Sequence, residues 1–277
     1  VRAIIEQHTL RIDTYADYTG DRSLWEGHFY SDKAPGASLI AVPPVVAARA
    51  LARMRGVDPV SLAGVVWTSY VATLATSALF TVIAALCIYW LTLRWGASRL
   101  AALFAASAYG LATPAWAYAT VFVGHSVTSG LLMAAFAAAV ALPDDPRRHL
   151  RMALAVGLLC GLAVVTEFPA AVPVAVIVLL AVSGVWTTDR KAALKVALVI
   201  ALGGALMALV LMGYHKAAFG SPFRLGYGNE DNAEGVRMRE HGLFGIGAPT
   251  WHVTYEVLLV AYRGLLPLAP LMALAPI

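Results

Sequence analysis

The sequence predicts an all-α, polytopic transmembrane helix bundle with about seven spans, preceded by a large polar segment that carries interfacial helices. Apolar residues make up 60% of the 277-residue chain and charged residues only 13%, whereas soluble domains contain roughly half and a quarter. Seven apolar runs approach the length of a membrane helix, and basic residues gather in alternate short loops between them. These observations together indicate a multi-pass membrane protein.

The first polar segment, 1–60, combines acidic with aromatic residues. Its acids are Glu6, Asp13, Asp17, Asp21, Glu26 and Asp32, and its aromatic residues are Tyr15, Tyr18, Trp25, Phe29 and Tyr30. Aromatic faces beside carboxylates suit a sugar, which stacks its C–H face and donates hydrogen bonds from its hydroxyls. The alternative is an aromatic belt at the membrane surface with solvated charges.

The most distinctive part of this segment is the stretch 27–36, Gly-His-Phe-Tyr-Ser-Asp-Lys-Ala-Pro-Gly. Pro35 restrains Ala34 to an extended conformation and Gly36 permits a turn, so Lys33 is expected on a rigid corner. A lysine at a membrane rim either neutralises a phosphate or reaches toward lipid headgroups. The apolar stretch after Gly36, edged by Arg49, Arg53 and Arg55, is predicted to form a helix lying in the interface.

The spans follow from length, because a hydrocarbon core of about 30 Å requires roughly 20 apolar residues in a helix. The predicted spans are 62–93, 98–118, 122–142, 152–167, 170–187, 193–214 and 256–277. The first is long enough to tilt or to project beyond the lipid. Those at 152–167 and 170–187 are short, and Pro169 and Pro173 at their junction predict a tight hairpin. The chain therefore divides into segment 1–60, a six-span bundle over 61–214, a polar loop over 215–255 and a final span over 256–277.

The short loops predict the orientation. Three of them are basic, with Arg94 and Arg99, then Arg147, Arg148 and Arg151, then Arg190, Lys191 and Lys195, while those near 119–121 and 168–169 contain no Lys or Arg. The positive-inside rule places the basic loops in the cytoplasm, and 1–60 and 215–255 outside. Basic loops beside membrane helices also account for the net charge of +4, so no nucleic-acid partner is expected.

Polar residues at the outer ends of the spans are the candidate functional residues. They are Tyr30, Asp32, Lys33, His125, Glu167, His215 and Arg263. His125 either reaches a phosphate or faces lipid headgroups, and Glu167 lines either a wet cavity or a solvated turn. Arg263 would lie about 10 Å inside the last span, where an arginine needs an anionic partner. That partner is either a phosphate or a carboxylate such as Glu256.

Three passages resemble the bacterial membrane glycosyltransferases of the C superfamily (GT-C), in the branch of protein O-mannosyltransferases and aminoarabinose transferases. They are 27–36 with Leu39 to Pro43, then Phe219-Gly220-Ser221-Pro222-Phe223 with Gly226-Tyr227, and Tyr262-Arg263-Gly264-Leu265 with Pro267 and Pro270. Other signatures of function are absent from the sequence, which has no phosphate-binding loop, dinucleotide fingerprint, zinc-ligand spacing or nucleophile elbow.

The resemblance implies an enzyme of the bacterial inner membrane with a large first periplasmic loop. It would transfer a sugar from a polyprenyl-phosphate donor to a lipid, glycan or protein acceptor on the periplasmic face. Asp32, the candidate catalytic residue within this chain, would support the acceptor or a divalent cation, and Lys33 would hold the donor phosphate. The resemblance also implies that the main catalytic base lies on a helix preceding Val1, so the chain is expected to be a piece of a longer protein. The alternative function is that of a non-catalytic membrane subunit of a larger complex.

Overall fold

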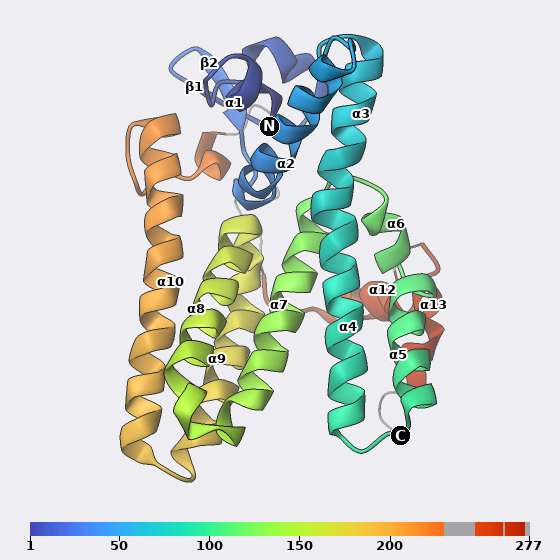
Figure 1. The fold of residues 1–277 in the computed structure, drawn as a ribbon, viewed down its shortest axis with the longest axis vertical. Coiled ribbons are helices and arrows are strands. Elements are labelled where there is room, and N and C mark those ends of the chain that lie inside the picture. Colours follow the sequence, from blue (N-terminus) through green and yellow to red (C-terminus); the bar gives the residue numbers. More distant parts are fainter. Residues whose placement is uncertain (230–246, 263, 275–277) are drawn as a thin grey trace.

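The computed structural model describes residues 1–229, 247–262 and 264–274, which form a helical bundle with a small strand hairpin at one end (Figure 1). Six helical segments in the described ranges are long and apolar enough to cross a membrane. They are Gly36–Met54, Leu62–Arg94, Gly124–Asp144, Pro146–Thr166, Phe168–Trp186 and Arg190–Phe219. The predicted all-α, multi-pass membrane bundle is therefore confirmed.

The polar segment at the start of the chain folds into short elements. They are helix α1 (Arg2–Glu6), the 3₁₀ turn η1 (Asp13–Tyr18) and the antiparallel strands β1 (Arg22–Trp25) and β2 (His28–Ser31). Glu26 and Gly27 join the strands with φ values of 51° and 80°, which are typical of the tight turn that matches the twist of a hairpin. Helices alone were expected in this segment, so the hairpin is a feature that the sequence analysis missed.

Helix α2 (Gly36–Met54) forms where an interfacial helix was predicted, but its length and composition also suffice for a membrane span. The following segment is continuous through helix α3 (Leu62–Thr73), the π-helical turn η2 (Leu74–Ala78) and helix α4 (Leu79–Arg94). Its 33 residues extend for about 50 Å at 1.5 Å per residue. The segment is therefore longer than the hydrocarbon core, as expected.

Two predicted spans are not single helices. The run 98–118 is divided into α5 (Arg99–Leu111) and α6 (Ala115–Ala119), because Pro114 disfavours helical geometry in the residue before it. The described part of 256–277 is divided among α12 (Trp251–Leu259), α13 (Leu265–Leu268) and the 3₁₀ turn η7 (Pro270–Leu274). Apolar composition predicted each run as one span, but the helix is interrupted after Leu111 in the first and after Leu259 in the described part of the second.

Four helices pack around the main apolar core. They are α7 (Gly124–Ala141), α8 (His149–Thr166), α9 (Ala171–Trp186) and α10 (Arg190–Phe219), with the 3₁₀ turn η5 (Phe168–Ala170) in the predicted tight hairpin between α8 and α9. Their contacts are mostly small and branched side chains, including Ala135, Ala153, Val156, Ala181 and Val196. Small residues allow membrane helices to approach closely, so this part of the bundle is tightly packed.

The two ends of the bundle differ in charge. At one end, here called the basic end, the connections α4–α5, α7–α8 and α9–α10 lie together (Figure 1), and Nη1 of Arg94 pairs with Oδ2 of Asp144 at 2.6 Å. The turns η3 (Leu142–Asp144) and η4 (Pro146–Arg148) belong to this end. The opposite end, here called the hairpin end, carries residues 1–35, the start of α7, the α8–α9 break and the end of α10. The structure thus groups the loops as the charge pattern predicts.

The chain that follows α10 returns to the hairpin. The Arg224 guanidinium lies 3.8 Å from the centroid of the Trp25 ring, and the Ser23 hydroxyl donates to the carbonyl of Gly226 at 2.7 Å. The 3₁₀ turn η6 (Gly226–Asn229) therefore lies against β1. These contacts bring Tyr227 to the region of the candidate site.

Candidate functional site

A cavity of about 840 Å³ lies at the hairpin end. Its polar and aromatic lining comes from segments far apart in the sequence, namely Arg2, Tyr15, Tyr18, Thr19, Asp21, Ser31, Lys33, Ser38, Thr68, Ser69, Phe122, His125, Thr166, Glu167 and Tyr227. The structure thus brings together three of the predicted site residues, Lys33, His125 and Glu167. Asp21 and Tyr227 are further members that the sequence analysis did not select.

Lys33 provides the cavity with a fixed positive charge. Its Nζ lies 3.1 Å from Oδ1 of Asp21 and 3.7 Å from Oδ2 of Asp32. Burial by itself lowers the pKa of the ammonium, but the two carboxylates outweigh burial and raise the pKa above its usual value. The ammonium is therefore charged at neutral pH, and 46% of the side chain remains exposed to meet an anion.

Asp32, the predicted catalytic residue, is only 2% exposed. Its neighbours Ser31 and Lys33 line the cavity, whereas Asp32 does not. A general base must reach the proton that it removes, and this geometry instead suits a carboxylate that holds Lys33 in place. The burial follows from the hairpin, because the glycine at 226 lies against the backbone of Asp32, where a Cβ would come 3.0 Å from its Cα.

His125 and Glu167 form a histidine–carboxylate pair at the cavity, with Nδ1 of His125 3.1 Å from Oε1 of Glu167. Gly124 makes this approach possible, because a Cβ at that position would collide with Oε1. The π-helical turn η2 fixes the preceding residue, since the Ser77 hydroxyl accepts from the backbone N–H of Val123 at 3.2 Å. The first turn of α7 is thereby held from both sides.

Tyr30 and His215 do not line the cavity and belong to an adjacent aromatic cluster. The Tyr30 ring packs on Phe219 at 5.3 Å between centroids, and His215 contacts Phe168 and Phe219 at 6.2 Å. Both predicted site residues are buried, and neither lines the cavity. Their observed role is to join the end of α10 to the hairpin and to the α8–α9 break. Arg263, the last predicted residue, lies outside the described residues.

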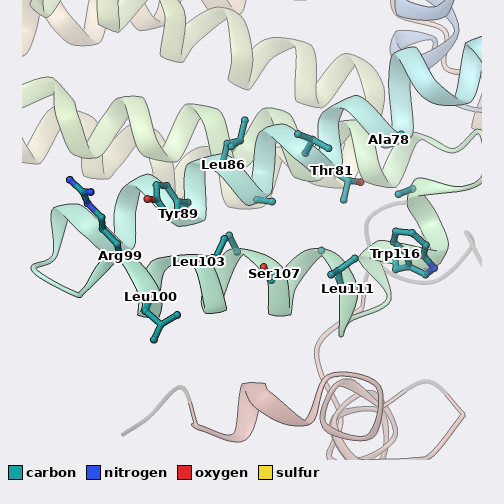
Figure 2. A pocket seen from close by; sticks show the side chains of 15 residues that line it. Ala78, Thr81, Leu86, Tyr89, Arg99, Leu100, Leu103, Ser107, Leu111 and Trp116 are labelled. Carbon is teal, nitrogen blue, oxygen red and sulfur yellow. The ribbon is translucent and has the colours of Figure 1, made fainter.

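The polar cavity adjoins an apolar one through His125. A second cavity of about 300 Å³ is also lined by His125, together with Ser126, Tyr109 and residues of α13 and η7. Thr81 belongs to both this cavity and a groove of about 800 Å³ between α4 and α5. Figure 2 shows that groove, with Tyr89 and Arg99 at one end and Trp116 at the other. The shared residues His125 and Thr81 thus place the polar cavity, the smaller cavity and the apolar groove next to one another.

The sequence suggested a divalent cation, but the described ranges contain no cluster of ligands for one. No group of three or more His, Cys, Asp or Glu side chains is placed there to hold a metal ion. In the part of the chain that the structure describes, the charged groups that line the cavity are therefore Arg2, Lys33, Asp21 and the His125–Glu167 pair.

In comparisons with known proteins, no protein-family model, no curated protein and no solved structure matches the chain. The sequence itself contains a pattern from which Asp21 could have been selected as a site residue. Glu26-Gly27 stands between two four-residue runs that pair as strands, with Arg22 opposite Ser31. A hairpin assigned on that pattern places Asp21 and Asp32 side by side beyond its last pair.

Proposed function

We propose that this chain is a membrane glycosyltransferase that moves a sugar from a polyprenyl-phosphate donor to an acceptor hydroxyl at the hairpin end of the bundle. One observation carries the proposal. The cavity that holds Lys33 shares His125 with a smaller cavity, which in turn shares Thr81 with the apolar groove between α4 and α5. A ligand with an anionic head and a long apolar chain fits such a combination.

The lining of the cavity supports each part of the donor. The Lys33 ammonium suits a phosphate, as a charged donor to its oxygens. The rings of Tyr18 and Tyr227 line the cavity and offer flat faces on which a sugar stacks. Beyond Thr81 the groove is lined by residues such as Leu86 and Leu103, which suit the isoprenoid chain.

The charge pattern supports an orientation for the reaction. Placing the basic end in the cytoplasm follows the positive-inside rule, so the hairpin end faces the periplasm of the bacterial inner membrane. A polyprenyl-phosphate sugar presented on that face meets a lipid, glycan or protein acceptor there. The proposal thus assigns residues 1–60 and the loop over 215–255 to the periplasmic side.

Binding of undecaprenyl phosphate by the full chain in detergent tests the proposal directly. We expect Lys33→Ala to weaken binding roughly 10- to 100-fold, because a hydrogen bond to a charged group contributes about 1.5–3 kcal/mol. Lys216→Ala is the matched control, since Lys216 is exposed at the same end but does not line the cavity. Undecaprenol, which lacks the phosphate, should bind as weakly to the wild type as undecaprenyl phosphate binds to Lys33→Ala.

Turnover of a panel of undecaprenyl-phosphate-linked hexoses and pentoses provides the second test. The wild-type chain should release the sugar from at least one of them, and Lys33→Ala should lower that rate at least tenfold. A wild type that binds undecaprenyl phosphate no better than undecaprenol, and that releases none of the sugars, would exclude this function.

A further inference from the structure

We propose that His125 is the general base of this transfer and that Glu167 is the residue that positions it. The inference rests on the proposed function. It differs from the expectation that a carboxylate of the first polar segment, or one on a preceding helix, removes the proton. The observation behind it is a histidine–carboxylate pair that opens onto the same cavity as Lys33.

The geometry of the pair determines which nitrogen is available. Glu167 engages Nδ1 of His125 at 3.1 Å, and a carboxylate at that nitrogen holds the proton there and leaves Nε2 as the acceptor. Within the described residues no hydrogen bond engages Nε2. The His125 side chain is 64% exposed in the protein alone and lines both the polar cavity and the adjoining one. Nε2 is therefore open to a substrate in either.

The other carboxylates near the cavity are less suited to the role. Asp21 lines the cavity, but its Oδ1 is engaged by the Lys33 ammonium at 3.1 Å. Asp32 is buried and outside the lining. Glu167 is itself only 23% exposed and is paired with the imidazole. Among the described groups that line the cavity, His125 combines basicity with access.

Three contacts hold the imidazole in place, as a positioned base requires. The Ser77 hydroxyl bonds to the backbone of Val123, on the N-terminal side of the helix start. Gly124 allows Glu167 to approach, and the ring of Tyr118 meets the His125 ring edge-on at 5.7 Å between centroids. His125 thus lies in the first turn of α7, and Glu167 directly follows the last residue of α8.

In the proposed step, the sugar passes from the phosphate of the donor to the acceptor oxygen. The acceptor oxygen forms a bond to C1 of the sugar while its O–H bond breaks, and the proton passes to Nε2 of His125. The bond between C1 and the phosphate oxygen breaks, and the polyprenyl phosphate leaves with the electron pair. Lys33 meets the charge on that phosphate, and Glu167 stabilises the imidazolium that has formed.

The test measures release of free sugar from a radiolabelled undecaprenyl-phosphate-linked hexose or pentose, whichever the wild type cleaves, with water in place of the unidentified acceptor. We expect His125→Ala to lower kcat by about 100- to 10,000-fold, the usual contribution of a general base, with little change in KM for the donor. Imidazole added to the solution should restore part of the rate. Glu167→Gln should lower kcat without raising KM, and Glu167→Asp should recover part of that loss.

The matched control is His28→Ala. His28 forms a similar pair, with Nδ1 2.9 Å from Oδ2 of Asp13, at the same end of the molecule but outside the cavity. It should retain wild-type turnover and should not respond to imidazole. If His125→Ala releases sugar as fast as the wild type, or if it is inactive and imidazole has no effect while it still binds undecaprenyl phosphate normally, the assignment of the base is wrong and the proposed function stands. If the wild type cleaves no donor, both the proposed function and the assignment of His125 as the base are wrong.

Discussion

The Nδ1 atom of His125 lies 3.1 Å from Oε1 of Glu167, although the two residues belong to different breaks in the helical bundle. His125 is in the first turn of α7, and Glu167 directly follows the last residue of α8. The two helices run antiparallel, so the start of one and the end of the next meet at the hairpin end. The pair is therefore built into the topology of the bundle.

Gly124→Ala should disrupt the His125–Glu167 pair without replacing either of the two residues. The added Cβ would occupy the position of the Glu167 carboxylate oxygen, which must then move away from the imidazole. We expect sugar release to fall about as far as in Glu167→Gln. The control is Gly213→Ala in α10, where a Cβ would meet nothing within 4 Å, and where alanine should raise stability by roughly 0.5–1 kcal/mol. Equal turnover in Gly124→Ala and Gly213→Ala would contradict the prediction.

Acid should destabilise the contact between α1 and α2 through Glu6. Burial raises the pKa of this carboxyl, but hydrogen bonds from Arg2, Tyr15 and Arg49 outweigh burial and lower the pKa to about 2. Because the folded-state pKa lies below the ordinary glutamate pKa of 4.5, the stabilisation is complete above pH 4.5 and is lost as the pH falls toward 2.

Glu6→Gln checks that dependence by thermal unfolding in detergent. At neutral pH the variant should be less stable by about 1.5–3 kcal/mol, the usual contribution of a hydrogen bond to a charged group. Its unfolding temperature should change less than that of the wild type between pH 5 and pH 3. Glu26→Gln, in the exposed hairpin turn, should behave as the wild type does. An acid response that Glu6→Gln leaves unchanged would rule this contact out as its source.

A bulky side chain in the groove between α4 and α5 should raise KM more for donors with a long lipid chain than for donors with a short one. Ala106 lines the groove, and Ala106→Trp would occupy much of the space that we assign to the isoprenoid chain. We expect KM for an undecaprenyl-phosphate donor to rise about tenfold or more, the effect of roughly 1.4 kcal/mol, while a farnesyl-phosphate donor of the same sugar is affected less. Ala205→Trp on the exposed side of α10 is the control. An equal effect of Ala106→Trp on both donors would contradict the assignment of the groove.

The contact between Arg224 and Trp25 should stabilise the return of the chain to the hairpin. The guanidinium lies 3.8 Å from the ring centroid, a distance at which a cation–π interaction contributes about 0.5–2 kcal/mol. A double-mutant cycle with Arg224→Gln and Trp25→Leu, followed by thermal unfolding in detergent, should give a coupling energy of that size. Additive effects of the two substitutions would show that the contact contributes nothing.

The amino-acid sequence was sufficient for the parts of the fold that depend on short-range chemistry. Apolar runs of membrane length predict the helices at 62–93, 122–142, 152–167, 170–187 and 193–214, since a bilayer core excludes unpaired backbone groups. The alternation of basic loops predicts which loops share an end. The predicted spans 98–118 and 256–277 are divided into shorter helices in their described parts, and their mean composition concealed the positions at which the helices break.

The tertiary structure decided which of the candidate residues meet. Asp32 and Lys33 are adjacent in the sequence and both were candidate site residues. The β1–β2 hairpin and the segment after α10 enclose Asp32 and leave Lys33 open to the cavity. His125 and Glu167 became partners only because α7 and α8 are antiparallel and Gly124 lets them approach. Apolar length and charge are properties of a segment and can be read along the chain. Burial and distance depend on which distant segments come to lie side by side, and only the folded bundle determines that.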